Sequence, residues 1–217
     1  MFGLGRQGGT VVRPEEALPG RTEPVQLSGA HFVHGRSILP PWPDGHRLAV
    51  LGMGCFWGAE RILWQLPGVW TTFVGYAGGT TPNPTYREVC SGRTGHAEVA
   101  VAVYDPDAIA FEAILAPFWE QHDPTQGMRQ GNDVGTQYRS IILTTDDEQA
   151  RTAEQSLAQY QATLRASGHG DITTAIGPLG ALFHAEEEHQ QYLAKHPGGY
   201  CNHGFCQAPY VPMASGA

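Results

Sequence analysis

The fold is decided by the stretch Leu48-Ala-Val-Leu-Gly-Met-Gly-Cys-Phe-Trp-Gly-Ala-Glu-Arg-Ile-Leu-Trp-Gln-Leu66. Its first six residues are an apolar run, which predicts a short buried strand. Glycines at positions 54 and 58 then turn the chain. The next apolar residues have the i, i+3, i+4, i+7 spacing of one helix face: Ala59, Ile62, Leu63 and Leu66. Pro67 and Gly68 end that helix. The stretch therefore predicts a strand, a turn that contains Cys55, and a helix.

Apolar patterning predicts the elements that follow this unit. Four more strands are expected, at residues 69–76, 97–103, 138–144 and 172–176. Three more helices are expected, at residues 107–119, 145–166 and 184–195. Asp107 is expected to cap the first of these helices, and Pro117 to disturb its last turns. The order β-α-β-β-α-β-α-β-α is typical of an α/β (α+β) two-layer sandwich, with helices packed on a mixed central sheet.

Length and glycine content predict how the chain is organised. A chain of 217 residues fits a single domain, and its 28 Gly and 16 Pro predict many turns and long loops. We expect residues 1–45 to form an arm that wraps the domain, residues 46–197 to form the catalytic core, and residues 198–217 to form a flexible Gly-rich tail. The loop at residues 122–137 is long for a compact domain, which favours a functional role.

Charge and cysteine usage exclude several classes of function. The formal net charge is −8 with no Lys/Arg cluster, which argues against a nucleic-acid partner. No apolar run approaches about 18 residues, so no transmembrane helix is expected. The first ten residues lack an apolar signal core, and we expect a cytoplasmic monomer. Static disulfides are then improbable for the four Cys, and thiol chemistry or metal binding is the better expectation.

Cys55 is the first candidate for chemistry. A thiolate between a strand and a helix faces unpaired N–H groups and the positive end of the helix dipole, which favours ionisation. Position alone is equally compatible with a buried, inert cysteine. Phe56 and Trp57 follow directly, and they suit either an apolar pocket beside the thiol or ordinary core packing.

Several motifs resemble one enzyme family. Gly54-Cys-Phe-Trp-Gly-Ala-Glu60 resembles the signature of the peptide methionine sulfoxide reductase A family, whose members are specific for the S epimer of the sulfoxide. Six further stretches are similar to the same family: Val74-Gly-Tyr-Ala-Gly-Gly79, Pro82-Asn-Pro-Thr-Tyr86, Cys90-Ser-Gly-Arg-Thr-Gly-His-Ala-Glu98, Gln126-Gly-Met-Arg-Gln-Gly-Asn-Asp133, Gly135-Thr-Gln-Tyr-Arg139 and His189-Gln-Gln-Tyr192. The resemblance covers roughly residues 20–206.

The resemblance implies a ferredoxin-like core and a role for each matching residue. Cys55 would attack the sulfoxide sulfur, and Glu98 would give a proton to the sulfoxide oxygen. Tyr86 and Tyr138 would hydrogen-bond that oxygen. Phe56 and Trp57 would hold the S-methyl group of the substrate. Asp133, His189 and Tyr192 would complete the site.

Elementary chemistry agrees with these roles. Charge builds on the sulfoxide oxygen during attack, and fixed O–H donors stabilise charge where it develops. A carboxyl that supplies the proton must stay protonated near neutral pH, which burial beside aromatic residues achieves. Glu98 on an apolar strand suits this role, although the sequence alone favours a solvated strand residue. The tyrosines, taken alone, also fit surface loops.

The tail suggests how the enzyme is recycled. Attack would leave Cys55 as a sulfenic acid, and a second thiol would then condense with this sulfenic acid. The resemblance implies Cys201 as this resolving thiol, with exchange to a Cys201–Cys206 disulfide that thioredoxin reduces. The gap between these two cysteines is shorter than in the best-known three-cysteine members of the family, which leaves the role of Cys206 open. Cys90 is interpreted as structural. No metal or other cofactor is expected, and the partners are thioredoxin and proteins or peptides that contain methionine sulfoxide.

Two other enzyme or binding classes compete with this hypothesis. A zinc site is one, because zinc accepts histidine and cysteine ligands from the last part of the chain: His184, His189, His196, Cys201, His203 and Cys206. Their spacing is not that of a structural zinc knuckle. A cysteine hydrolase that pairs Cys55 with His189 is the other. A pure binding module is disfavoured because nothing in the acidic composition marks a partner surface.

Overall fold

The sheet at the centre of the fold has six strands. The computed structural model describes residues 9–201, 203 and 208–212. The strands lie in the order β7-β6-β1-β3-β2-β8, and only β6 and β7 run parallel. Their bounds are β1 Arg47–Gly52, β2 Val69–Ala77, β3 Ala97–Tyr104, β6 Ile141–Thr144, β7 Ala175–Pro178 and β8 Leu182–His184. The sheet is therefore mixed, as predicted.

Four of these strands and two helices form the ferredoxin-like core. Along the chain the order is β1, α1, β2, β3, α3 and β6, and in space the strands lie as β6-β1-β3-β2. The helices are α1 Phe56–Trp64 and α3 Phe111–Gln121. This β-α-β-β-α-β arrangement is the expected fold class, with β7 and β8 added at the two edges. Consequently the turn after β1, which holds Cys55, lies at the end of a central strand.

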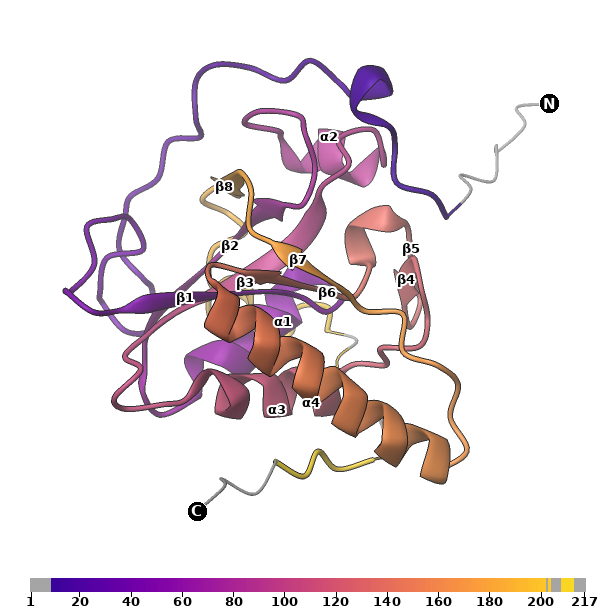
Figure 1. The fold of residues 1–217 in the computed structure, drawn as a ribbon. Coiled ribbons are helices and arrows are strands. Elements are labelled where there is room, and N and C mark those ends of the chain that lie inside the picture. The colour runs from indigo at the N-terminus through magenta and orange to yellow at the C-terminus, as the bar shows by residue number, and fades with distance from the viewer. Residues whose placement is uncertain (1–8, 202, 204–207, 213–217) are drawn as a thin grey trace.

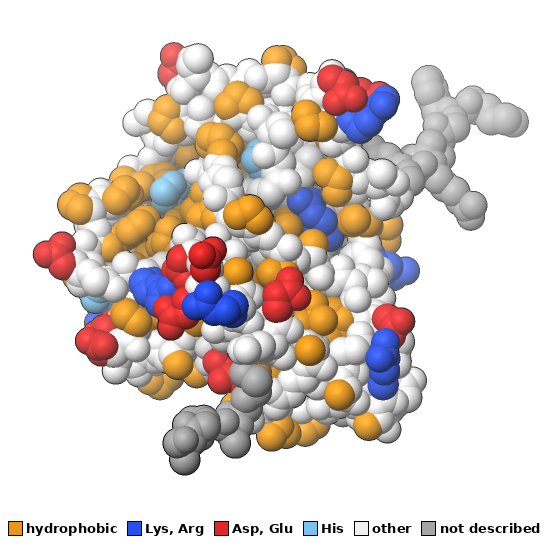
Figure 2. Space-filling view, viewed as in Figure 1, with side chains coloured by type: hydrophobic (Ala, Val, Ile, Leu, Met, Phe, Trp, Pro, Cys, Tyr) orange, Lys and Arg blue, Asp and Glu red, His pale blue; other side chains and the backbone are white. Residues whose placement is uncertain are grey.

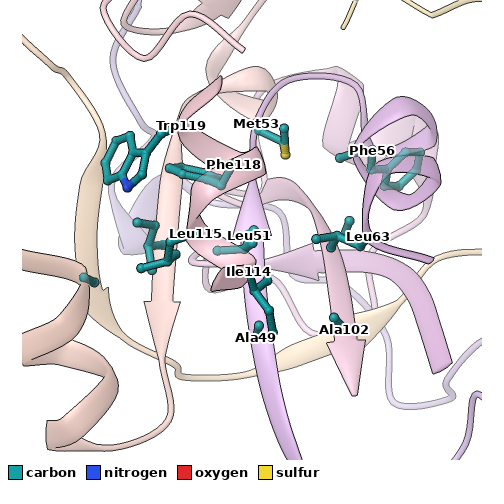
Figure 3. Packing of buried hydrophobic residues seen from close by; sticks show 14 of the residues in the cluster. Ala49, Leu51, Met53, Phe56, Leu63, Ala102, Ile114, Leu115, Phe118 and Trp119 are labelled. Carbon is teal, nitrogen blue, oxygen red and sulfur yellow. The ribbon is translucent and has the colours of Figure 1, made fainter. Parts of the chain in front are cut away.

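Helices α1, α3 and α4 (Asp147–Ala166) cover one face of the sheet (Figure 1). Leu51 on β1 lies between the side chains of Phe118 on α3 and Leu63 on α1 (Figure 3). All three side chains are fully buried in one apolar cluster. Burying a large apolar side chain contributes about 1.5–3 kcal/mol, so this cluster fixes α1, and the turn before it, against the sheet.

The second face of the sheet is covered by the segment that precedes β1. Ile38 is fully buried there against Phe73 and Val101, and Leu39 and Trp42 pack on the same cluster. Both faces of β3 are therefore sealed, and all eight of its residues are buried. On the surface drawn in Figure 2, acidic and basic side chains lie next to one another. None of the described helices is long and apolar enough to cross a membrane.

Helix α3 differs from the sequence prediction at both ends. Asp107 does not cap it, because Asp105 and Asp107 form a turn in which the Asp107 N–H donates to the Asp105 carboxylate at 2.9 Å. The helix begins at Phe111 instead, with Ala110 at the N-cap. Pro117 lies inside the helix without ending it. Two fully buried aromatic residues follow Pro117, and their packing outweighs the lost backbone hydrogen bond.

The last part of the chain also differs from the prediction. The expected strand at 138–144 begins at Ile141, after a 3₁₀ turn at Thr136–Tyr138, and the one at 172–176 lies at Ala175–Pro178. The expected helix at 184–195 is wrong: His184 ends β8, and only Tyr192–Lys195 form a helix, α5. Gln190 causes this, because its side chain bonds Val74 N, Val74 O and Ala185 O and holds the segment beside β2.

Short elements complete the fold. Helix α2 (Tyr86–Cys90) is capped by Thr85 and Glu88 in a capping box. Helix α4 begins one residue after its N-cap, Asp146, and ends at Ala166 as predicted. The loop at 122–137 contains a small hairpin of β4 (Arg129–Gln130) and β5 (Asp133–Val134). A 3₁₀ turn, η1, lies at Pro14–Glu16.

Candidate active site

Cys55 occupies the N-cap position of α1 and is 6% exposed. Gly54 before it has a φ of +94°, in the region that favours glycine, and a Cβ there would lie 2.7 Å from the Gln130 side chain. Burial raises the pKa of the Cys55 thiol above its usual value, and the charge of Glu98 raises it further. The backbone N–H groups of Trp57 and Gly58 lower the pKa, as expected of a helix N-terminus, but they do not outweigh burial. The unliganded site therefore holds a thiol.

Glu98 lies second on β3 and is 1% exposed. Its Oε2 accepts a hydrogen bond from Phe56 N at 3.1 Å. Its Oε1 is buried and has no partner among the described residues. Burial raises the pKa of this carboxyl to about 8, and the charge of Asp133 raises it too. At neutral pH the group is protonated, and its O–H has no acceptor within the part of the chain that the structure describes, which suits a proton donor for a bound ligand.

Tyr86 and Tyr138 bring two hydroxyl groups to the same place. Tyr86 begins α2, and Tyr138 ends the 3₁₀ turn at Thr136–Tyr138. Burial raises the pKa of both hydroxyls, and the next largest cause in each case is the charge of Glu98. Both groups are therefore neutral donors close to the Glu98 carboxyl.

Cys90 lies beside these tyrosines, and its interpretation as a structural residue stays a prediction. The side chains of Tyr86 and Tyr138 lower the pKa of its thiol, which places both beside it. Burial raises the pKa of Cys90 to about 11, so it is a neutral thiol. A signal for this position was present in the sequence, because Cys90 follows Tyr86 by four residues and so shares a helix face with it.

Aromatic side chains form the wall beside Cys55. The Trp57 ring stacks on Tyr192 with 4.0 Å between centroids, and the His189 ring lies 4.4 Å from Tyr86 and 5.5 Å from Phe56. Trp57 Nε1 donates to His189 Nδ1 at 3.3 Å. The predicted substrate-binding residues thus form one connected set of ring contacts together with Tyr86: Phe56, Trp57, His189 and Tyr192. Such a wall suits a small apolar group such as a thioether methyl.

His189 is not placed as a partner base for Cys55. Burial lowers its pKa, so the ring is neutral, and its Nδ1 is occupied by the Trp57 indole. In the described part of the chain no hydrogen bond joins Cys55 to His189. A nucleophile and its base must lie within hydrogen-bond reach, so the cysteine hydrolase alternative loses its catalytic pair.

Asp133 connects the site to the tail. It lies on β5, and its charge raises the pKa of Cys55, Glu98 and Tyr138. Its Oδ1 accepts a hydrogen bond from the Tyr200 hydroxyl at 3.2 Å. The long loop at 122–137 therefore delivers Asp133 to the edge of the site, where the tail crosses it.

The tail lies on the first turns of α1. Arg61 Nη2 donates to Cys201 Sγ at 3.1 Å. His203 Nε2 donates to the Met53 carbonyl at 2.7 Å, and burial lowers the pKa of His203 to about 4. A Cβ on Gly58 would lie 2.9 Å from Cys201 Sγ and 2.2 Å from His203 Nδ1. The absent side chain of Gly58 thus lets Cys201 approach the helix turn that follows Cys55.

The structure bears differently on Cys206 and on the zinc-site alternative. Cys206 lies outside the described residues. Among the residues that the structure does describe, no group of three or more His, Cys, Asp or Glu side chains could hold a metal ion. His203 was expected only as a candidate zinc ligand, and nothing in the sequence pattern indicates its contact with the carbonyl of Met53, two residues before Cys55.

Comparison with known proteins finds chains that are similar in sequence and in structure. Residues 47–209 match the family model of peptide methionine sulfoxide reductase. A Salinispora arenicola protein named peptide methionine sulfoxide reductase MsrA is 59% identical over 203 residues, covering 93% of this chain and 92% of that protein. An MsrA of Methylococcus capsulatus is also 59% identical, over 194 residues, covering 89% of this chain and 87% of that protein. Methionine sulfoxide reductase A of Corynebacterium diphtheriae has a similar structure, with a TM-score of 0.82 and 47% identity, covering 88% of this chain and 93% of that one.

Proposed function

Because the chain belongs to the peptide methionine sulfoxide reductase family, we propose that it reduces methionine sulfoxide at Cys55 and acts on the S epimer. It is an oxidoreductase that returns methionine sulfoxide to methionine. The observation that carries the assignment of the site is the Glu98 carboxyl, which is protonated at neutral pH and has an unpartnered Oε1 among the described residues. The charge of that group raises the pKa of the Cys55 thiol, so the two lie close together.

Binding orients the sulfoxide in this proposal. The S-methyl group lies against Phe56 and Trp57, where apolar contact favours it. The oxygen then faces the Glu98 O–H and the hydroxyls of Tyr86 and Tyr138, which donate to it. The methyl group and the oxygen occupy fixed positions and the peptide must leave through the open side, so one epimer fits and its mirror image at sulfur does not.

The chemical step transfers oxygen from the substrate to Cys55. Glu98 gives its proton to the sulfoxide oxygen, and the Cys55 sulfur attacks the sulfoxide sulfur as its own proton passes to Glu98. The hydroxyl then moves from the substrate sulfur to the Cys55 sulfur, which breaks the substrate S–O bond and the transient S–S bond and forms the S–O bond of the sulfenic acid. The substrate sulfur gains two electrons and becomes the thioether of methionine, and Cys55 loses two electrons and becomes a sulfenic acid. Tyr86 and Tyr138 stabilise the charge on the oxygen while it moves. Glu98 ends the step protonated, as it began.

Cys201 resolves the sulfenic acid in the next step. Its sulfur attacks the Cys55 sulfur, a Cys55–Cys201 disulfide forms, and the oxygen leaves as water with the Cys201 proton and the sulfenic proton. The position of Cys201 over Gly58 and its contact with Arg61 support this assignment. Thioredoxin then reduces the disulfide, directly or after exchange with Cys206. We further propose a cytoplasmic monomer, since that compartment maintains reduced thioredoxin.

The experiment supplies the two epimers of a methionine sulfoxide peptide separately, with thioredoxin, its reductase and NADPH. We expect methionine from the S epimer only, and none from Cys55→Ser with either epimer. Equal turnover of the R epimer would refute the proposed stereochemistry. Turnover by Cys55→Ser would refute Cys55 as the attacking group. Turnover with dithiothreitol but not with thioredoxin would refute the proposed reductant.

A further inference from the structure

A second carboxyl in α1 has no part in the chemistry above. Glu60 is completely buried, and three donors converge on its two oxygens. The Gln191 backbone N–H donates to Oε2 at 2.8 Å, and the Gln191 side-chain amide donates to Oε1 at 2.6 Å. The Thr72 hydroxyl donates to Oε1 at 3.0 Å. Glu60 therefore joins three elements: α1, β2 and the turn that leads into α5.

The Thr72 hydroxyl and the Gln191 side-chain amide are each oriented by a second hydrogen bond, and this fixes them as donors to Glu60. His31 Nδ1 accepts from the backbone N–H groups of Val33 and His34, at 3.1 and 3.0 Å. The proton of this buried ring is therefore on Nε2, which donates to Thr72 Oγ1 at 2.9 Å. The Thr72 hydrogen is then free to point at Glu60.

The amide of Gln191 is oriented in the same way. Its Oε1 accepts from the Phe32 backbone N–H at 3.0 Å, which places its NH₂ group toward Glu60. Glu60 thus meets donors only, as an ionised carboxylate requires, and hydrogen bonds to a charged acceptor are about twice as strong as neutral ones. Burial raises the pKa of Glu60 to about 7, while the bonds from Gln191 and Thr72 and the charge of Lys195 on α5 lower it. The neutral His31 ring is linked to Glu60 through the Thr72 hydroxyl.

The residue that Glu60 holds has an unfavourable backbone conformation. Gln191 has a φ of +46° and a ψ of +40°, the left-handed region that non-glycine residues rarely adopt. It is fully buried at the N-cap of α5. Glu60 bonds both its backbone N–H and its side chain, so this carboxylate supports the conformation that turns the chain at this point.

Two pocket residues flank that turn. His189 lies two residues before Gln191, and its Nδ1 accepts from the Trp57 indole at 3.3 Å. Tyr192 follows Gln191 directly and stacks on the Trp57 ring, with 4.0 Å between ring centroids. Since Trp57 and Glu60 lie one turn apart on α1, Glu60 ties the turn to the helix that also bears the pocket and the nucleophile.

We propose that Glu60 is a positioning residue for substrate binding: its carboxylate fixes the turn at Gln191 so that His189 and Tyr192 close the aromatic pocket over Trp57. The inference rests on the proposed function, because it assigns that pocket to the S-methyl group of the substrate. Loss of the carboxylate loosens the pocket and leaves Cys55, Glu98 and the tyrosine hydroxyls in place. Binding should suffer more than the chemical step.

Glu60→Gln is the first test, with Glu154→Gln on the exposed side of α4 as the matched control. The amide introduced at position 60 would set an N–H group against donors from Thr72 or Gln191. We expect KM for an S-sulfoxide peptide to rise about tenfold or more, as for a lost charge-assisted hydrogen bond. The single-turnover rate of methionine formation at saturating substrate should fall less than about threefold if positioning acts on binding. The control should match the wild type in both.

A residue swap separates positioning from general damage to the core. In Glu60→Gln with Gln191→Glu, the amide lies on residue 60 and the carboxylate on residue 191, so their hydrogen bond is restored in the reverse direction. Residue 191 still accepts from Phe32 N, and Thr72 accepts the second amide hydrogen. We expect KM at least about threefold below that of Glu60→Gln, because the pair interaction is regained while the bond from residue 191 to the Thr72 carbonyl is lost. No recovery in the swap, with both proteins folded, would overturn the pairing.

Gln191→Gly covers the case in which Glu60→Gln does not fold. Glycine suits the left-handed φ and keeps the backbone N–H bond to Glu60, but it removes the side-chain bond. KM should rise about three- to tenfold if that bond positions the turn. Wild-type KM in either folded single variant would overturn the inference. Absence of turnover by the wild-type enzyme would instead refute the proposed function.

Discussion

Replacement of Glu98 by glutamine tests whether the proton donor is maintained at a cost in stability. Glutamine has almost the same shape, and it cannot ionise or give up a proton. Burial raises the pKa of Glu98 from its usual value of 4.5 to about 8 in the folded protein. The folded state therefore binds this proton more tightly than the unfolded state does. The stabilisation linked to the proton is full below pH 4.5, and it is lost as pH rises through 8.

The size of the effect follows from the two pKa values. One pKa unit corresponds to about 1.4 kcal/mol, so a shift from 4.5 to about 8 corresponds to about 5 kcal/mol in total. Compared with a side chain that stays neutral, ionisation of Glu98 in the unfolded state lowers the free energy of unfolding of the wild type by about 1 kcal/mol at pH 5, about 3 kcal/mol at pH 7 and about 5 kcal/mol at pH 9. The free energy of unfolding of Glu98→Gln minus that of the wild type should thus increase by about 4 kcal/mol between pH 5 and pH 9.

Urea unfolding of both proteins at pH 5, 7 and 9, in the presence of a reductant, measures this difference. Because the comparison is made across pH, any fixed gain or loss from the new amide cancels. Glu154→Gln, exposed on α4, is the control and should show a constant difference. The same Glu98 variant should form methionine about 10²- to 10⁴-fold more slowly in a single turnover, as expected when a general acid is removed.

A stability difference that does not change with pH would refute the raised pKa, and with it the reason that Glu98 is protonated at neutral pH. Normal single-turnover rates in the variant would refute its role as the acid. The two results are independent, so they separate the electrostatic argument from the mechanistic one.

The remaining predictions concern the thiols and the tail. Cys55→Ser should form no methionine in a single turnover, measured by amino-acid analysis, and detectable product would contradict its role. Cys201→Ala should form about one methionine per enzyme and then stop with thioredoxin as reductant; sustained turnover would show that another thiol resolves Cys55. Gly58→Ala should leave the first methionine largely unaffected but slow disulfide formation at least tenfold, because its Cβ would lie 2.2 Å from His203 Nδ1 and displace the tail. Free-thiol titration after one turnover measures that step, and an unchanged rate would mean that the observed tail position is not the reactive one.

Local pattern in the sequence was enough for the core of the fold. The apolar run before Cys55 and the helix spacing after it are local signals, and the structure has β1 and α1 where they predict. The succession of such elements predicted a mixed α/β sandwich, and the resemblance to the reductase family implied its ferredoxin-like core. The pattern failed where a side chain replaced regular structure: Gln190 bonds the backbone of β2, and no periodicity reveals that the segment before α5 is a turn rather than a helix.

The sequence also named the site residues, through motifs, but it did not determine their ionisation. A helix N-terminus by itself favours a Cys55 thiolate, and an alternating strand by itself leaves Glu98 in water. Both expectations are reversed because α1 and its neighbours cover one face of β3 and the segment around Ile38 covers the other. Desolvation is summed over atoms from distant parts of the chain, so it is a property of the tertiary structure alone. The sequence determined which groups are present and the order in which the elements run, and the packing of remote segments decided which of those groups hold a proton.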